Sequence, residues 1–186
     1  MYIADMFCFG SDQNGVGVNG ILGCMGVFVS YGTMLHGIHM PDSVADKAAR
    51  GRGAFNDYIR HQAGANFNGG NATMICVANG TERMSASDEL YDLCRLLGMR
   101  EFAVFRPFSN VDKGAAIAAV WERQGNGPPE LKYRMDKDVV WQEGLGTARG
   151  GHYGAFRDDA RLSTNTGNWH AARPPNAHGL VHHLVN

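Results

Sequence analysis

Cys24 and His39 are the two residues whose types and spacing suggest catalysis. Cys24 follows a glycine at the front edge of an apolar, strand-like run, and His39 closes the next apolar run fifteen residues later. A thiol beside an imidazole is the minimum apparatus for cysteine nucleophilic catalysis: the imidazole takes the thiol proton, and the thiolate attacks an electrophilic carbon. This pair is the candidate active site.

Each residue also has an ordinary structural explanation. A free cysteine is among the most buried residue types, and a histidine at a strand end more often caps the strand or lies at the surface. His36 competes with His39, at twelve residues from Cys24. The two histidines have opposite strand parity, so only one of them can face the thiol in a regular strand. A hairpin favours His39, because antiparallel neighbours place such residues side by side at one sheet edge.

Several neighbours could support the pair. Gly23 allows close approach of a substrate and leaves backbone N–H groups free for an oxyanion, and Gly26 keeps the same surface open. A catalytic histidine usually needs a third group to fix its tautomer. Asn19, Ser30 and a backbone carbonyl near Val18 are the candidates for this role, and the sequence does not choose among them.

The elements that position the pair form an expected hairpin. Residues 21–30 read as one strand, residues 31–33 as a turn and residues 34–40 as the returning strand. A short strand is expected over residues 6–9. The glycine-rich residues 10–20 predict a loop, which lacks the Gly-Lys-Ser/Thr ending of a phosphate-binding loop.

Helices and strands alternate after the hairpin. A helix is expected to start at residues 41–43 and to kink or break at Gly51 and Gly53. A second helix is expected over residues 85–97, with Gly98 as its C-cap, and a third, alanine-rich one over residues 113–123. Further strands are expected at residues 72–78, 102–105, 132–135 and 139–141. This order predicts an α+β fold, a layered sandwich of a mostly antiparallel sheet with helices packed against it.

Length and composition limit the remaining possibilities. The 186 residues predict one domain (1–186), with a core over about residues 5–125 and a tail over residues 163–186 that is irregular or wraps the domain. The 17 basic and 18 acidic side chains offer no electrostatic case for nucleic acid or an anionic membrane surface. No stretch reaches the roughly 20 apolar residues that a membrane span needs. The first residues lack a signal-peptide pattern, which predicts a bacterial cytoplasmic protein, or one secreted or injected without a cleaved leader.

Metal binding is not expected. The four cysteines lie at positions 8, 24, 76 and 94 without a Cys-x-x-Cys pair. The C-terminal histidines have no carboxylate or cysteine partner at ligand spacing; they include His178, His182 and His183. Cys76 and Cys94 are expected to be buried thiols that act as small hydrophobes.

The pattern Leu22-Gly23-Cys24 with Gly37-Ile38-His39 resembles the core of the chemotaxis-receptor glutamine deamidases of the CheD type. It is also similar to the catalytic domains of cytotoxic necrotizing factors and of the Burkholderia lethal factor. The match covers roughly residues 5 to 60, with a compatible order of elements to about residue 125. The resemblance implies hydrolysis of a glutamine side-chain amide in a protein target, with Cys24 as nucleophile, His39 as base and no cofactor.

The chain departs from these families at two positions. Leu22 stands where the toxins usually carry serine, and Val18 where the receptor deamidases and the lethal factor place threonine. The third catalytic contact therefore stays open between Asn19 and the backbone at Val18.

The resulting hypothesis is a protein-glutamine deamidase that acts as a bacterial effector or toxin. One alternative keeps the pair but makes the chain another cysteine hydrolase, a peptidase or acyl transferase. A further alternative is a non-catalytic binding or immunity protein in which Cys24 belongs only to the core.

Overall fold

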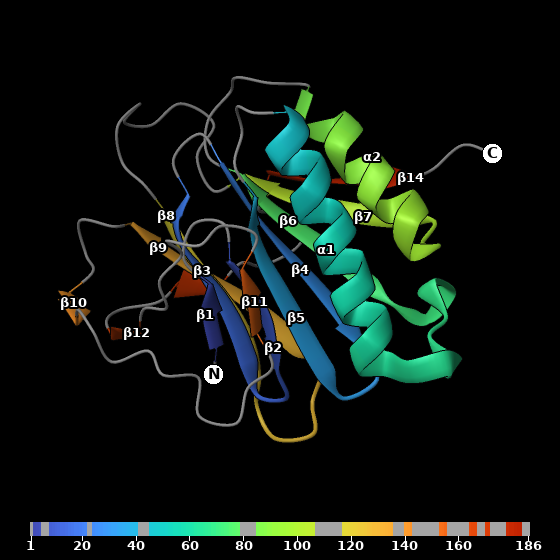
Figure 1. The fold of residues 1–186 in the computed structure, drawn as a ribbon. Coiled ribbons are helices and arrows are strands. Elements are labelled where there is room, and N and C mark those ends of the chain that lie inside the picture. The colour runs from blue at the N-terminus through green and yellow to red at the C-terminus, as the bar shows by residue number, and fades with distance from the viewer. Residues whose placement is uncertain are drawn as a thin grey trace.

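The computed structural model describes residues 2–4, 8–21, 24–40, 45–78, 85–106, 117–135, 140–142, 153–155, 164–166, 170–171 and 178–183. Two large β-sheets, a separate two-stranded pair and two α-helices make up the described fold. The helices α1 (Ala45–Ala63) and α2 (Ser85–Leu97) lie together over one face of the larger sheet (Figure 1). The smaller sheet packs on its opposite face. This arrangement confirms the expected α+β layered sandwich, with two sheets in place of one.

The larger sheet has seven strands in the order β11-β2-β5-β4-β6-β7-β14. Their bounds are Tyr153–Ala155, Cys8–Asp12, Met34–Met40, Met25–Tyr31, Thr73–Ala78, Glu101–Arg106 and His178–His183, in that order. Neighbouring strands are antiparallel except β6 and β7, which are parallel. The connection between these two contains α2, as a parallel pair requires a crossover.

The smaller sheet has five strands in the order β1-β3-β8-β9-β13. They are Tyr2–Ala4, Gly15–Ile21, Ile117–Arg123, Pro129–Met135 and His170–Ala171. β10 (Val140–Gln142) and β12 (Thr164–Thr166) form a separate antiparallel pair. Short 3₁₀ turns at Gly64–Asn66 and Gly69–Asn71 connect α1 to β6.

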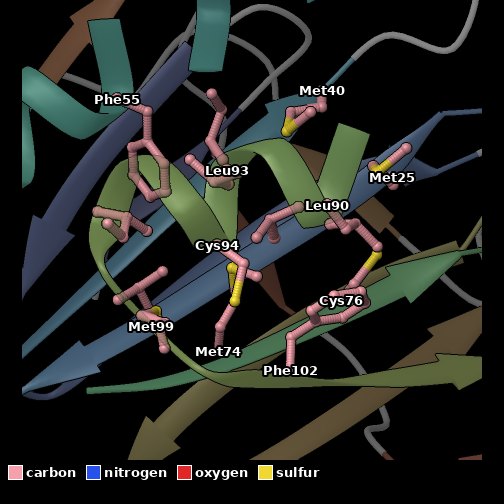
Figure 2. Packing of buried hydrophobic residues seen from close by; sticks show 14 of the residues in the cluster. Met25, Met40, Phe55, Met74, Cys76, Leu90, Leu93, Cys94, Met99 and Phe102 are labelled. Carbon is pink, nitrogen blue, oxygen red and sulfur yellow. The ribbon is translucent and has the colours of Figure 1, made fainter. Parts of the chain in front are cut away.

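The side chains of β4 alternate between two apolar clusters, as the period of a strand requires. Met25, Val27 and Val29 pack with α1 and α2, in a cluster rich in methionine and cysteine sulfur (Figure 2). Phe28 packs on the other face, against Trp121 of β8, with ring centroids 6.4 Å apart. A strand buried on both faces explains the continuous apolar run over residues 25–29.

The local predictions at the hairpin and at α2 are confirmed. β4 and β5 pair in register from Met25 opposite Met40 to Tyr31 opposite Met34. The turn between them contains Gly32 at φ 57°, a conformation that favours glycine. α2 spans the expected residues, and Gly98 follows it at φ 67°.

The predicted loop over residues 10–20 is wrong. These residues complete β2 and form β3, joined by a tight turn in which Asp12 Oδ1 accepts hydrogen bonds from the backbone N–H groups of Asn14 (2.7 Å) and Gly15 (3.1 Å). Val16 and Val18 alternate with glycines and are fully buried between the sheets. Small residues at the alternate positions suit a strand in close contact with its neighbours.

The predicted helix over residues 113–123 is also wrong in its described part, because residues 117–123 form β8. This strand pairs with β3 on one side and β9 on the other. Ala119 and Trp121 face the larger sheet. Burial and pairing on both sides override the helix propensity of the alanines. Residues 113–116 lie outside the described residues.

The expected kink or break in the first helix needs correction. α1 runs through Gly51 and Gly53 without a break, since Phe55 and Ile59 anchor it to the sheet.

The tail over residues 163–186 contains β14 in its described part. β14 pairs with β7 from His178 opposite Arg106 to His183 opposite Glu101, so this part of the chain wraps onto the edge of the larger sheet.

Candidate active site

Cys24 and His39 meet where β4 begins and β5 ends. In the hairpin register, Gly26 of β4 lies opposite His39 of β5, so the two residues share a face of the sheet. Cys24 is two residues before Gly26 and therefore belongs to the same face. The Sγ atom of Cys24 lies 2.9 Å from Nε2 of His39, so the thiol and imidazole that the sequence predicts as a pair are in hydrogen-bond contact.

His36 lies on the opposite face. Its register partners are Val29 of β4 and Ser11 of β2, and its ring meets Tyr58 of α1 edge-on, with centroids 6.1 Å apart. The hydroxyl groups of Tyr58 and Ser11 form a hydrogen bond of 2.7 Å beside it. His36 thus belongs to the interface between sheet and helices, and His39 is the histidine that faces the thiol.

A third group at the site comes from the smaller sheet. The Sγ atom of Cys24 donates to the carbonyl oxygen of Gly20 at 3.3 Å. β3 has a bulge-like register shift between Val18 and Ile21, and Gly20 within it has φ 67°. This contact is not among those expected from the sequence. The available signal was a glycine near the end of an alternating valine-glycine run, where a bulge places a backbone carbonyl out of the ladder.

Gly26 has a different role from the one that the sequence suggested. A Cβ atom at this position would lie 3.0 Å from Cδ1 of Ile21 and 3.1 Å from Cβ of Val18. Gly26 therefore does not keep an open surface for a substrate. It allows β3 to approach β4 closely, and this approach brings Gly20 to the thiol.

The imidazole is deeply buried. His39 is 1% exposed, and this burial lowers its pKa from 6.5 to about 4. Its Nδ1 atom makes no hydrogen bond within the described part of the chain. Asn19 is also buried, at 3% exposure, but neither its side chain nor the backbone of Val18 bonds to Nδ1. Within the described residues, Nδ1 of His39 thus has no group that fixes its tautomer.

Two of the other cysteines lie away from the pair. Gly23 and Leu22 lie outside the described residues. Cys76 and Cys94 are fully buried on the helix side of the larger sheet, as the sequence predicts. Burial raises the pKa of Cys94 to about 11, although the nearby Arg95 opposes this effect. These thiols therefore do not share the surroundings of Cys24.

No protein-family model matches this chain, and no curated protein matches it at a significant level. The resemblance to the glutamine deamidases therefore depends on the short patterns around Cys24 and His39 alone.

Other kinds of site receive no support from the described residues. Within them, no group of three histidine, cysteine or acidic side chains is placed to hold a metal ion. None of the described helices is long and apolar enough to cross a membrane. The side chains of the C-terminal histidines lie outside the described residues.

The geometry of the pair defines what it can do chemically. A thiol in contact with an imidazole can add to a carbonyl carbon once the imidazole accepts its proton. Cys24 retains 9% exposure, whereas His39 is almost completely enclosed. Of the two residues, the cysteine is therefore the more accessible to a substrate.

Proposed function

We propose that the chain is a cysteine-dependent hydrolase that deamidates glutamine side chains in a protein target. The observation that carries this proposal is the 2.9 Å contact between Sγ of Cys24 and Nε2 of His39. The resemblance around these two residues supports the choice of an amide as substrate.

The first half of the reaction forms a thioester. Nε2 of His39 takes the proton of the thiol, and the thiolate of Cys24 attacks the carbon of the glutamine carboxamide. A C–S bond forms, and the carbonyl electron pair moves to oxygen. Protonated His39 then gives its proton to the amide nitrogen, the C–N bond breaks, and ammonia leaves.

The second half hydrolyses the thioester. His39 takes a proton from water, whose oxygen attacks the thioester carbon. The C–S bond breaks, the sulfur recovers its proton from the imidazolium, and glutamate remains on the target. The net reaction converts glutamine and water into glutamate and ammonia. The thiol and the imidazole supply the nucleophile and the proton transfers, so the proposed reaction needs no cofactor.

The limited exposure of Cys24 favours a side-chain amide over a peptide bond. A glutamine carboxamide stands at the end of two methylene groups and is bonded to the chain on one side only. A peptide bond has chain on both sides and needs a cleft that accepts several residues. Because Cys24 is only 9% exposed, we expect deamidation rather than proteolysis.

The proposed partner is a folded protein that presents a glutamine, and the proposed setting is a bacterial effector or toxin. Replacing a neutral amide by a carboxylate introduces a charge into the target. Where the glutamine orients a catalytic water or lies in an interface, this single charge blocks the target's activity.

The test is to incubate the protein with a blocked Gln-Gly dipeptide, with casein and with bacterial and eukaryotic cell lysates. Deamidation releases ammonia and raises the mass of a modified peptide by about 1 Da. Cys24→Ala should abolish both signals, whereas Cys76→Ala serves as a control that removes a buried thiol elsewhere. Cleaved peptides that depend on Cys24 would establish the peptidase alternative. The absence of any product that depends on Cys24 would favour the non-catalytic binding protein.

A further inference from the structure

Among the described residues, the thiol hydrogen of Cys24 has two acceptors within reach. One is the carbonyl oxygen of Gly20, at 3.3 Å from Sγ, and the other is Nε2 of His39, at 2.9 Å. A thiol carries one hydrogen, and a neutral imidazole carries one N–H group and one acceptor nitrogen. The resting site therefore has two alternative hydrogen-bond arrangements, which differ in the tautomer of His39.

In the first arrangement the thiol donates to Nε2, and the imidazole proton resides on Nδ1. This N–H group is buried and has no hydrogen-bond partner within the described residues. An unpaired buried donor costs the desolvation of that group, which is larger than the net gain from a typical hydrogen bond. The carbonyl of Gly20 also loses the thiol as a donor.

In the second arrangement the thiol donates to Gly20, and Nε2–H of His39 donates to the sulfur. Both donors are then paired, and only the lone pair of Nδ1 lacks a partner. This arrangement satisfies more buried polar groups than the first.

The described strands around the pair offer no charged side chain to a thiolate–imidazolium pair. The strands β3, β4, β5 and β6 contain no Asp, Glu, Lys or Arg residue. Their other titratable side chains are Tyr31, at the far end of the hairpin, and His36 and Cys76, which face the helices. His39 is therefore the titratable group that these strands present to the thiol. The Gly20 carbonyl would also point its negative end at a thiolate.

We propose that Gly20 is a positioning residue that holds the pair in an inactive resting arrangement, in which the thiol donates its hydrogen bond to the Gly20 carbonyl and the imidazole proton resides on Nε2 of His39. In this arrangement Nε2 cannot take the thiol proton, because it already carries one. That this arrangement is inactive in catalysis rests on the proposed function, whereas the placement of the two protons does not.

Activation then requires two changes. The thiol must leave Gly20, and the imidazole must exchange its proton: Nε2 releases one proton to water, and Nδ1 takes another from water, so the ring stays neutral. The new Nδ1–H group needs an acceptor. One displacement of β3 would both remove the Gly20 carbonyl from the thiol and bring an acceptor to Nδ1–H. This strand carries Gly20 together with the carbonyl of Val18 and the side chain of Asn19. Docking of a protein substrate supplies the energy for such a displacement.

The conformation of Gly20 makes the proposal testable by substitution. Gly20 has φ 67°, and a Cβ atom there would meet nothing within 4 Å. A substitution therefore acts through the backbone rather than through a clash. Asparagine tolerates this left-handed conformation, whereas a β-branched residue strongly disfavours it. Gly20→Asn should keep the carbonyl in place, and Gly20→Val should turn it away from the thiol.

The experiment determines the tautomer of His39 by ¹⁵N NMR and the rate of Cys24 alkylation by iodoacetamide between about pH 5 and pH 9. In the wild type and in Gly20→Asn, we expect the proton of His39 on Nε2. We expect the rate of Cys24 alkylation to rise as the pH approaches about 8.5, where an ordinary cysteine ionises. In Gly20→Val we expect the Nδ1–H tautomer and alkylation at neutral pH faster by roughly 2- to 12-fold, the factor for the loss of one hydrogen bond.

Two results would overturn the proposal. One is a wild-type imidazole with Nε2 unprotonated. The other is an imidazole protonated at both nitrogens, with rapid alkylation at pH 6. The wild-type ¹⁵N spectrum alone shows which nitrogen of His39 carries the proton, so it tests the proposal even if Gly20→Val does not fold. Since neither readout uses a substrate, the proposed deamidation can fail without affecting this result, and the resting arrangement can be disproved while deamidation is observed.

Discussion

His36 and His39 lie three residues apart on β5, and their side chains point to opposite faces of the seven-stranded sheet. His36 meets Tyr58 beneath α1, whereas His39 meets Cys24 between the two sheets. Each of the two residues is 1% exposed. One strand thus carries two equally buried histidines of which only one contacts a nucleophile, and this arrangement provides a matched pair for mutagenesis.

We first predict that His39→Gln abolishes the proposed activity, while His36→Gln does not. General base catalysis typically contributes about 10²- to 10⁴-fold, so kcat for ammonia release should fall by that factor in the first variant. His36→Gln should retain the wild-type kcat per folded molecule, because its ring lies behind the sheet. Equal losses in both variants would assign the effect to the fold rather than to the base.

The pair itself could be predicted because both members belong to one hairpin. The apolar runs over residues 21–30 and 34–40, separated by a turn with Gly32, fix the pairing partner and the parity of each histidine. α2 could be predicted for a similar local reason, since its periodicity ends at Gly98. Information of this kind is contained within twenty residues of chain.

The contact between Gly20 and Cys24 could not be predicted from the same pattern. It depends on β3, whose glycines led to the prediction of a loop. It also depends on the packing of one sheet against the other. β8 was mistaken for a helix because its alanines favour helices locally, and its strand pairing involves β3, about a hundred residues away in sequence. Burial against strands that are distant in sequence determines whether such segments form strands. Local composition is a poor indicator of that burial.

The second prediction concerns the pH dependence of stability. Burial lowers the pKa of both His36 and His39 from 6.5 to about 4. The unfolded chain therefore binds more protons than the folded protein between these values. The stability from each neutral histidine is complete above about pH 6.5 and is lost as the pH falls towards 4. The free energy of unfolding should drop by on the order of 2 kcal/mol per histidine between about pH 7.5 and pH 5.

Urea denaturation at a series of pH values measures this loss, and His36→Phe is the matched variant. An aromatic ring of similar shape keeps the contact with Tyr58 but cannot be protonated. The variant should lose about half of the pH dependence. A slope in this pH range identical to that of the wild type would show that His36 does not remain neutral in the folded protein.

The third prediction is that Gly53→Ala stabilises the protein. Gly53 lies inside α1, and a Cβ atom at this position would meet nothing within 4 Å. Alanine is favoured over glycine in a helix interior by about 0.5 to 1 kcal/mol. Thermal unfolding should show a higher Tm, with unchanged alkylation of Cys24. A lower Tm would indicate that the helix needs the freedom of glycine at this point.

The last prediction is that Gly26→Ala has the opposite effect. Its Cβ atom would lie 3.0 Å from Cδ1 of Ile21 and 3.1 Å from Cβ of Val18, so these neighbours would have to shift by a few tenths of an ångström. Overpacking of this kind typically costs about 1 to 3 kcal/mol. Relief of the clash should move β3 away from β4, and with it the Gly20 carbonyl away from the thiol of Cys24. We therefore expect a lower free energy of unfolding together with a changed pH profile of Cys24 alkylation.

Gly53→Ala is the control for this change, since it adds the same methyl group to the same protein without a clash. A Gly26→Ala variant that loses stability but keeps the wild-type alkylation profile would show that Gly26 serves the packing of the two sheets alone. A variant with wild-type stability and a wild-type profile would contradict the close approach of β3 to β4. Only the combined change would connect the packing of the sheets, through Gly26 and Gly20, to the protonation of the nucleophile.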